Sequence, residues 1–351
     1  MPSTKPNMKF NGTVCESCNY HSNFKRQKID WGARNKEFLE LITKIKKKKN
    51  FYDALVPVSG GKDSITQVHH LLKAGLRVLA LNIDYGLKTE IGKYNLELIP
   101  KMGASLFTFR PNLKVHKKIL KISFLDYGDP DLMSHCMLHA LPIKTAIKFD
   151  IPLVFLGENS ALEYSGDTKY DQKKITKEWF NKYAANSNNT PDKFAKKHKI
   201  SYANLEIYNL PSEKELSKTT AVFCSYFFKW SSESNLKIAE KYGFKKLKQN
   251  SEGTFRTFVG IDEKINRIHQ YLKFLKFGYG RASDHASEDI RNKKITRSQG
   301  IKLVKKYDRV KITKPFYKEF IDFIGISEKK FFKVLTKYTN FKIQSYIKKI
   351  I

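Results

Sequence analysis

Two glycines that follow a serine separate an apolar segment from an amphipathic one, in the run Val58-Ser59-Gly60-Gly61-Lys62-Asp63-Ser64. The apolar segment over 52–58 is short and ends at these glycines, which is typical of a buried strand. From Lys62 to Ala74, apolar residues recur at helical spacing, and Gly75 suits the position just after a helix. The run therefore predicts a tight turn that joins a buried strand to an amphipathic helix.

The residue types in this turn suit a phosphate group. Glycines let backbone N–H groups approach an anion closely, and the dipole of the first helical turn favours negative charge there. The hydroxyls of Ser59 and Ser64 could donate hydrogen bonds to phosphate oxygens, whereas Asp63 would repel phosphate unless it holds Mg²⁺ or orients a donor. The loop therefore predicts a site for a metal-bound polyphosphate; an ordinary glycine-rich turn is the alternative.

Strand-like and helix-like segments alternate over the first two thirds of the chain. Further strands are predicted over 77–83, 104–109, 151–157 and 220–228, and further helices over 31–49, 90–101, 134–149 and 233–242. This alternation predicts an α/β fold with a doubly wound parallel sheet and right-handed crossovers. Asp84 and Gly157-Glu158 each follow a predicted strand, at the sheet edge where such folds bind ligands.

Three regions follow from these patterns. Residues 1–30 are polar and contain Cys15 and Cys18, and residues 31–250 hold the α/β alternation. A polar segment rich in Lys and Asn, at about 165–215, interrupts the alternation and is interpreted as an insertion. Residues 251–351 are predicted to be helical.

Composition narrows the classes of protein. Lysines and arginines total 66 against 34 acidic residues, a net charge of +32 that would attract polyanions such as nucleic acid, nucleotides or an anionic membrane. The basic residues are spread along the chain, which favours solvated surface instead. No apolar run of about 18 residues predicts a membrane span, and no apolar signal core follows Met1. Four cysteines exclude a disulfide scaffold, so we expect a cytoplasmic protein.

The loop resembles the SGGxDS pyrophosphate loop of the ATP pyrophosphatase (PP-loop) superfamily. Its members cleave ATP between the α- and β-phosphates, adenylate a carbonyl-type oxygen, and let a nitrogen or sulfur nucleophile displace AMP. The resemblance implies a sheet of the adenine-nucleotide alpha-hydrolase type with ATP and Mg²⁺ as cofactors. It implies catalytic roles for Lys62 and Asp63 and nucleotide binding by Ser59, Gly60, Gly61, Asp63, Ser64, Asp84 and Gly157.

Further motifs narrow the resemblance to the N-acetyl sugar amidotransferases of the WbpG/PseA type. In chain order they are Gly157-Glu158-Asn159-Ser160, Glu163-Tyr164-Ser165-Gly166, Ser251-Glu252-Gly253-Thr254, Ile261-Asp262-Glu263-Lys264-Ile265, Lys276-Phe277-Gly278-Tyr279-Gly280-Arg281-Ala282, Glu288-Asp289-Ile290-Arg291 and Lys305-Lys306-Tyr307-Asp308. The resemblance covers about residues 10–340 and is weakest over 165–215. It implies charge stabilisation by Lys276 and Arg281, and substrate binding by Glu158, Asn159, Glu163, Tyr164, Glu252, Gly253 and Thr254.

The resemblance also implies a reaction. The amide oxygen of an N-acetylated sugar, either nucleotide-linked or a nonulosonate, attacks the α-phosphate of ATP, and ammonia then displaces AMP to leave an acetamidino group. Such sugars belong to lipopolysaccharide O-antigen or flagellin-sugar biosynthesis. Residue 2 is Pro and no Cys lies in a recognisable nucleophile elbow, so we predict that a separate glutaminase subunit supplies the ammonia.

Two groups of residues carry metal hypotheses. Cys15-x-x-Cys18 resembles half of a four-cysteine zinc site, and members of the family carry an earlier C-x-x-C pair, so we expect the natural reading frame to begin upstream of Met1. Two thiolates alone would not close a zinc site. His135 and His139, four residues apart on a predicted helix beside Cys136, could face one ion, although core or site-lining roles are the simpler interpretation.

Two other functions compete. A tRNA-modifying PP-loop enzyme, either a thiolating enzyme or a lysidine-forming ligase, would suit the net charge of +32, and Cys136 and Cys224 could be its catalytic pair. The C-terminal motifs have no reason to occur in such an enzyme, so we do not expect nucleic acid as a partner. A non-catalytic nucleotide-binding protein is the third possibility, and the intact loop argues against it.

Overall fold

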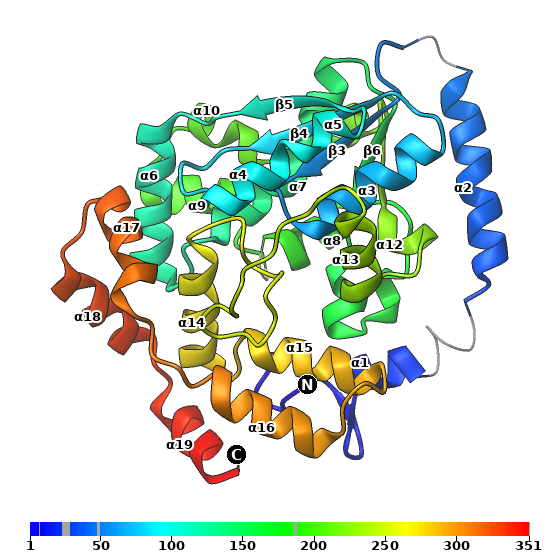
Figure 1. The fold of residues 1–351 in the computed structure, drawn as a ribbon. Helices are drawn as coiled ribbons and strands as arrows, with labels where there is room; N and C mark the ends of the chain where they lie inside the picture. The colour runs from blue at the N-terminus through cyan, green and yellow to red at the C-terminus, as the bar shows by residue number, and fades with distance from the viewer. Residues whose placement is uncertain (7, 23–28, 48–49, 186–187, 351) are drawn as a thin grey trace.

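The computed structural model describes residues 1–6, 8–22, 29–47, 50–185 and 188–350. Its centre is a five-stranded parallel sheet with the strand order β5-β4-β3-β6-β7 (Figure 1). The strands are β3 (Ala54–Val58), β4 (Val78–Ile83), β5 (Ser105–Phe109), β6 (Leu153–Leu156) and β7 (Thr220–Phe223). The predicted α/β class with a parallel sheet is confirmed, and the strand order reverses between β3 and β6, where ligands bind in such sheets.

Alternating side chains of the central strand bury both faces of the sheet. Ala54, Val56 and Val58 pack in one core with α2 (Trp31–Lys46) and α3 (Lys62–Lys73). Leu55 packs on the other face with α7 (Leu132–Lys148). These four residues of β3 are at most 5% exposed, and burying an aliphatic side chain contributes about 1.5–3 kcal/mol. This double burial explains why the strand is a continuous apolar run.

Most boundaries differ from the predictions by a few residues, and residues 48–49 of the helix predicted over 31–49 lie outside the described residues; two elements differ more. The last strand ends at Phe223, and α12 (Cys224–Phe227) follows where the strand was expected to continue. The Ser225 hydroxyl accepts a hydrogen bond from the backbone N–H of Asn159, which joins this turn to the end of β6. The helix expected over 90–101 is divided into α4 (Glu90–Leu96) and α5 (Leu98–Lys101).

The polar insertion lies between β6 and β7 and folds into short helical segments. They are η3 (Ala161–Ser165), η4 (Thr168–Tyr170), α8 (Lys177–Trp179), η5 (Phe180–Ala184), α9 (Pro191–His198), α10 (Tyr202–Leu205), η6 (Glu206–Tyr208) and α11 (Glu213–Leu216). Trp179, Phe194 and Tyr208 are almost fully buried in the core that contains α7. A few large aromatic side chains therefore anchor a segment whose composition is otherwise that of a surface loop.

The C-terminal region is helical, as predicted. After α13 (Ser232–Glu240) it contains α14 (Asn266–Phe277), α15 (Arg281–Arg291), α16 (Arg297–Tyr307), α17 (Lys314–Ile324), α18 (Glu328–Tyr338) and α19 (Phe341–Ile350). Helices α14, α17 and α18 share a core with Leu120 of α6 (Leu113–Ile122) and Phe124 of η2 (Ser123–Tyr127), so this region is packed against the α/β layers. None of the helices in the described ranges is both long and apolar enough to cross a bilayer.

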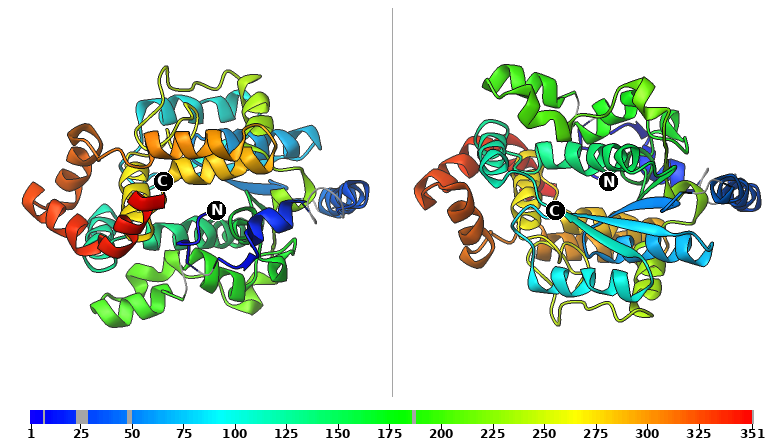
Figure 2. Two further views of the ribbon diagram at one scale, coloured as in Figure 1. Left: turned by 90° about the horizontal axis from the view of Figure 1, so that it is seen from below. Right: turned by 90° about the horizontal axis from the view of Figure 1, so that it is seen from above.

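The N-terminal segment returns to the C-terminal helices. It forms the two-stranded ribbon of β1 (Phe10–Asn11) and β2 (Val14–Cys15) and the short helix α1 (Glu16–Tyr20). Seen from below, it lies between the orange C-terminal helices and the green segment that follows β6 (Figure 2). Gly166 makes this contact close, since a Cβ there would lie 2.7 Å from the carbonyl oxygen of Glu16.

Candidate active site

The loop between β3 and α3 is held by its own serines. The backbone N–H of Ser59 donates to the hydroxyl of Ser64 at 3.0 Å, and the N–H of Gly61 donates to the hydroxyl of Ser59 at 3.3 Å. Gly61 is the N-cap of α3 and has no side chain to cap it. The two hydroxyl oxygens lie 3.5 Å apart at the start of a 12-residue helix, which is the arrangement that favours an anion.

Residues far away in the sequence contact the backbone of this loop. Gly60 has a φ of +92°, and a Cβ there would lie 2.3 Å from the carbonyl oxygen of Gly92. Lys88 is buried and donates from Nζ to the carbonyl oxygen of Ser59 at 3.0 Å and to Glu263 at 2.8 Å. Lys88 thus links Glu263 of the C-terminal region to the loop, and only a glycine fits at position 60.

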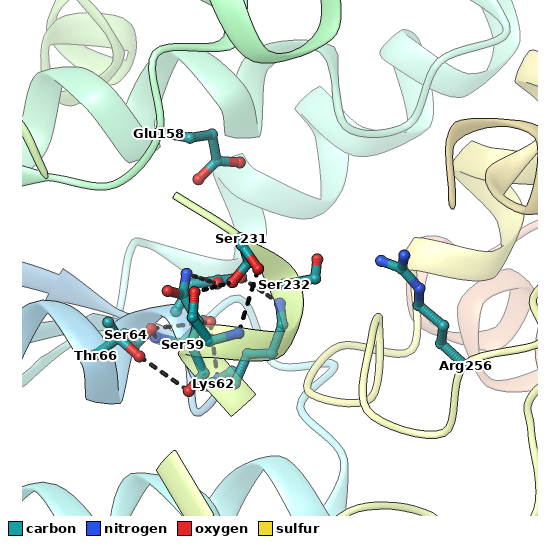
Figure 3. A network of polar contacts seen from close by, with 12 residues as sticks. Ser59, Lys62, Ser64, Thr66, Glu158, Ser231, Ser232 and Arg256 are labelled. Atoms are coloured by element: carbon teal, nitrogen blue, oxygen red, sulfur yellow. Dashed lines mark hydrogen bonds and ion pairs between the residues drawn. The ribbon is translucent and has the colours of Figure 1, made fainter. Parts of the chain in front are cut away.

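Asp63 is fixed by three neighbours. Its carboxylate accepts hydrogen bonds from Lys62 Nζ and from Asn235 Nδ2, both at 2.7 Å, and its carbonyl oxygen accepts one from Gln67. The carbonyl oxygen of Asn235 in turn accepts from Thr66 at 3.1 Å, which ties α13 to α3. Figure 3 shows Ser231 and Ser232, at the start of α13, beside the loop, with Glu158 and Arg256 extending toward this network from two other sides.

Asp63 and Glu158 fit a magnesium ion bound to phosphate. Both carboxylates line the same two cavities. Burial raises the pKa of Glu158, and the charge of Asp63 acts in the same direction. Within the described ranges, no three His, Cys, Asp or Glu side chains converge as a complete metal site. Mg²⁺ commonly takes one or two carboxylates and completes its shell with phosphates and water, so Asp63 and Glu158 are the carboxylates here that could hold it.

Two cavities meet at this loop. The larger, of about 560 Å³, is bounded by Ser59 and Ser64 on one side and by α7 and α14 on the others. The smaller, of about 100 Å³, lies beside Lys62, Trp230 and Ser232. Five residues line both: Asp63, Glu158, Tyr164, Arg281 and Asp284. A nucleotide and a second substrate could therefore meet at these residues.

Arg281 is placed where an anion would bind. It lies at the start of α15, lines both cavities, and its Nε is buried without a hydrogen-bond partner among the described residues. Although burial opposes its charge, the neighbouring Tyr164 and Asp284 raise its pKa, so the guanidinium stays charged. By contrast, Arg256 is paired with Glu288 at 2.7 Å and with Asp289 at 2.6 Å.

The N-terminal segment forms a wall of both cavities. Lys5 lines the larger cavity and donates to the carbonyl oxygen of Tyr164, while Ser17 lines the smaller one and donates to the same oxygen at 2.9 Å. A hydrogen bond from the Cys18 thiol lowers the pKa of Cys15 to about 4. In the described part of the chain no third His, Cys, Asp or Glu side chain joins these two thiols, so the zinc site that the spacing suggests stays a prediction.

Some predicted site residues lie elsewhere. Lys276 donates from Nζ to the carbonyl oxygen of Tyr127 at 2.7 Å and lines neither cavity. Asp84 is paired with Arg110 and also lies outside both cavities. Glu252 accepts hydrogen bonds from Arg267 and from Thr313, so it joins parts of the C-terminal region to one another. Their predicted roles therefore find no support in their positions.

Other predicted residues position the site. Gly157 is in the larger cavity wall, while Asn159 is buried and bonds to Trp179 Nε1 and to the carbonyl oxygen of Tyr170. Glu163 and Tyr164 line the smaller cavity. Thr254 is buried and hydrogen-bonds His285 at 2.9 Å, and His285 lines that cavity. Gly253 has a φ of +77° and its Cα faces the Arg267 guanidinium.

The cysteines and histidines of α7 point in different directions. His135 and His139 line the larger cavity, and burial lowers the pKa of His139 to about 4. Cys136 faces the carbonyl oxygen of Ala184 in the core, and burial raises its pKa to about 12. Cys224 is fully buried and lies outside both cavities. The structure does not bring these two thiols to the site.

Sequence reasoning missed residues that reach the site from helix faces. Asn266, His269, Gln270 and Lys273 of α14 lie at helical spacing and all line the larger cavity. The only available signal was a polar stripe on an otherwise apolar helix. Lys88 was also missed, because nothing in its local sequence shows that it contacts Ser59.

Comparison with known proteins identifies the C-terminal region. Residues 252–349 match the family model described as LPS biosynthesis protein WbpG-like, C-terminal domain. Comparison with curated proteins gives no match. The match confirms the resemblance that the C-terminal motifs predicted, for the region that carries α14 and α15.

Three solved structures resemble the chain at low identity. The U34-tRNA thiolase NcsA from Methanococcus maripaludis with its 4Fe–4S cluster is 12% identical, with a TM-score of 0.33 over 81% of this chain and 82% of that one. The NMN synthetase from Francisella tularensis is 14% identical, with a TM-score of 0.31 over 69% and 94%. The NAD+ synthetase from Burkholderia pseudomallei is 11% identical, with a TM-score of 0.29 over 65% and 91%. At these values the likeness does not bear on activity.

Proposed function

We propose, on the premise that this chain carries a WbpG-like C-terminal domain behind a PP-loop α/β domain, that it is an ATP-dependent amidotransferase acting on the N-acetyl group of a sugar. One observation carries the proposal. Residues of the WbpG-like region, among them Glu263, His269 and Arg281, line the same cavity as Ser59 and Ser64 of the phosphate loop. In this proposal the WbpG-like region lines the part of the cavity that binds the sugar, and the phosphate loop lines the part that binds ATP.

The first step joins the amide to the nucleotide. The amide oxygen forms a bond to the α-phosphorus of ATP, the bond to the β-phosphate oxygen breaks, and pyrophosphate leaves. The loop N–H groups and the hydroxyls of Ser59 and Ser64 hold the departing phosphates, and Arg281 faces the charge that develops between the two cavities. Mg²⁺ held by Asp63 and Glu158 would neutralise charge on the phosphates.

The second step replaces the oxygen. Ammonia adds to the adenylated carbon, one proton leaves the added nitrogen, and AMP departs with the former amide oxygen, which leaves an acetamidino group. Adenylation is needed because the oxygen of an amide is a poor leaving group. None of the four cysteines, all of which lie in the described ranges, lines either cavity, so we assign the ammonia supply to a separate glutaminase subunit in the cytoplasm.

The test uses the purified chain with ATP, MgCl₂ and an ammonium salt. Its substrates are a panel of N-acetylated sugars comprising nucleotide-linked hexosamines and both free and nucleotide-linked nonulosonates. We expect one sugar to gain NH in place of oxygen while AMP and pyrophosphate accumulate in equal amounts, and glutamine not to replace ammonium. A Ser64→Ala variant should lose AMP formation. Release of ADP and orthophosphate, or no product with any sugar, would refute the proposal.

A further inference from the structure

The lining of the larger cavity includes a histidine held by a carboxylate. His269, on α14, hydrogen-bonds from Nδ1 to Oδ1 of Asp129 at 2.9 Å. Asp129 is buried, and its Oδ1 also accepts the backbone N–H of Asp131 at 3.1 Å, which fixes the carboxylate. Nδ1 of His269 is therefore the protonated nitrogen, and Nε2 remains as an acceptor on a side chain that lines the cavity.

The charges around His269 favour this arrangement. Asp129 and Asp131 face it from the start of α7, His135 of α7 packs edge-on at 5.4 Å between ring centroids, and Lys273 lies one turn along α14. Although burial lowers the pKa of His269, the carboxylate of Asp129 outweighs it and raises the pKa above the ordinary value. Such an imidazole is both oriented and basic enough to take up a proton near neutral pH.

The proposed reaction has one proton to remove. When neutral ammonia adds to the adenylated carbon, the new nitrogen carries three hydrogens and a positive charge. The C–O bond to AMP breaks readily only after that nitrogen has lost one proton. The lone pair that the proton leaves behind then forms the new C–N π bond as AMP departs. An acceptor on the cavity wall is suited to this step.

We propose that His269 is the proton acceptor for the attacking ammonia and that Asp129 is its positioning residue. The inference rests on the proposed amidotransferase function. Nε2 of His269 takes the proton from the added nitrogen, and the electron pair of that N–H bond stays on nitrogen and then displaces AMP. Asp129 holds the Nδ1–H tautomer and stabilises the imidazolium that forms, as a carboxylate does behind a catalytic histidine elsewhere.

The test separates adenylation from amidine formation in a His269→Asn variant. Asn keeps a donor near the Nδ1 position for Asp129 but has no group in place of Nε2. Adenylation is followed by sugar-dependent exchange of labelled pyrophosphate into ATP, with the sugar of the panel that the wild-type enzyme uses best. The second step is followed by product formation with ammonia and, separately, with hydroxylamine. Hydroxylamine is a much weaker base, so its adduct loses the proton readily without an acceptor.

We expect His269→Asn to keep exchange within about threefold, lose at least about 100-fold of the ammonia reaction, and lose less than about tenfold of the hydroxylamine reaction. Asp129→Asn should show the same split to a smaller extent. His198→Asn is the matched control, since His198 faces Asp126 at 3.7 Å but lines neither cavity, and it should change none of the three rates.

Three results would overturn the assignment: an unchanged ammonia reaction, equal losses with both nucleophiles, or a parallel loss of exchange. Retained exchange in the same sample shows that the variant is folded. If wild-type enzyme shows no exchange with any sugar, the proposed function itself fails, and this inference fails with it.

Discussion

Polar groups of the phosphate loop are hydrogen-bonded to one another, whereas polar groups of Arg281 and Gln270 in the lining of the larger cavity (here called the wall) have no hydrogen-bond partner among the described residues. In the loop, Ser64 accepts the N–H of Ser59, and Lys62 donates to Asp63. On the wall, Nε of Arg281 and Oε1 of Gln270 are buried without a hydrogen-bond partner among the described residues, and both side chains line the larger cavity.

We infer that the phosphate loop is preorganised in the free protein, whereas the polar groups of the cavity lining obtain hydrogen-bond partners only when a ligand binds. A buried polar group without a partner costs about 1–3 kcal/mol, so such groups persist where a ligand satisfies them. The hydrogen bonds of the loop hold Gly60 at its positive φ and in close contact with Gly92. Arg281 and Gln270 leave a donor and an acceptor unsatisfied in the cavity lining, where a polar ligand could bond to them.

The largest expected effect comes from breaking the loop. Gly60→Ala places a Cβ 2.3 Å from the carbonyl oxygen of Gly92 at a φ of +92°, so the loop backbone must move. We expect AMP formation to fall by at least about 1,000-fold, measured as pyrophosphate release, because the N–H groups leave their positions.

Gly103→Ala is the matched control for that change. Gly103 has a φ of +105° but open space around a built Cβ. Its substitution carries the same kind of backbone strain, of about 1–2 kcal/mol, without touching the loop. Equal loss of AMP formation in both variants would contradict the view that the loop depends on its close contact with Gly92.

Substitutions of two arginines distinguish a residue that binds ligand from a residue that stabilises the fold. Arg281→Gln should lower AMP formation by about 100-fold to 1,000-fold without lowering Tm, because no described residue satisfies its Nε. Arg256→Gln should destabilise the fold by about 3–5 kcal/mol, because it leaves the buried Asp289 and the half-buried Glu288 without their partner. Thermal unfolding and turnover of both variants check this; a large fall in Tm for Arg281→Gln would count against it.

Glu158→Gln should raise the stability of the free protein at high pH and weaken its binding of Mg²⁺. Burial and Asp63 raise the pKa of Glu158, so the stability linked to its protonation is present below its ordinary pKa and is lost as pH rises through the raised one. The variant should therefore be more stable than wild type at high pH without ligand, and should need about tenfold more Mg²⁺ for half-maximal rate. Calorimetry between pH 4 and 9 and Mg²⁺ titration measure the two effects; a variant less stable at high pH would exclude this explanation.

The smallest expected effect is at the buried thiol. Cys224→Ala should change AMP formation by less than about threefold, because the thiol lies outside both cavities and burial raises its pKa well above the ordinary value. Abolished turnover would instead favour a thiolating enzyme, in which this cysteine takes part in chemistry.

The sequence predicted what is local. The strand–turn–helix around Ser59, the parallel sheet and the helical C-terminal region all follow from periodicity within short windows, and the structure confirms them. The loop after β3 could be recognised because its function depends on neighbours in the chain.

Contacts between distant segments could not be read in this way. The family resemblance placed Lys276 at the site, but its ammonium group donates to the carbonyl oxygen of Tyr127. His269 was overlooked because its orientation and basicity depend on a hydrogen bond to Asp129, which lies 140 residues earlier in the chain. The last strand was overextended because aromatic residues after Phe223 favour a strand locally, whereas Phe227 turns into the core with Phe38.

The most direct test of the central claim follows the amide oxygen itself. An N-acetylated sugar of the panel would carry ¹⁸O in its acetamido group, and AMP released in the presence of ammonia would be analysed by mass spectrometry. Adenylation of that oxygen predicts one ¹⁸O atom in the phosphate of every AMP formed with the amidine. Unlabelled AMP, or ¹⁸O retained in the sugar product, would contradict it.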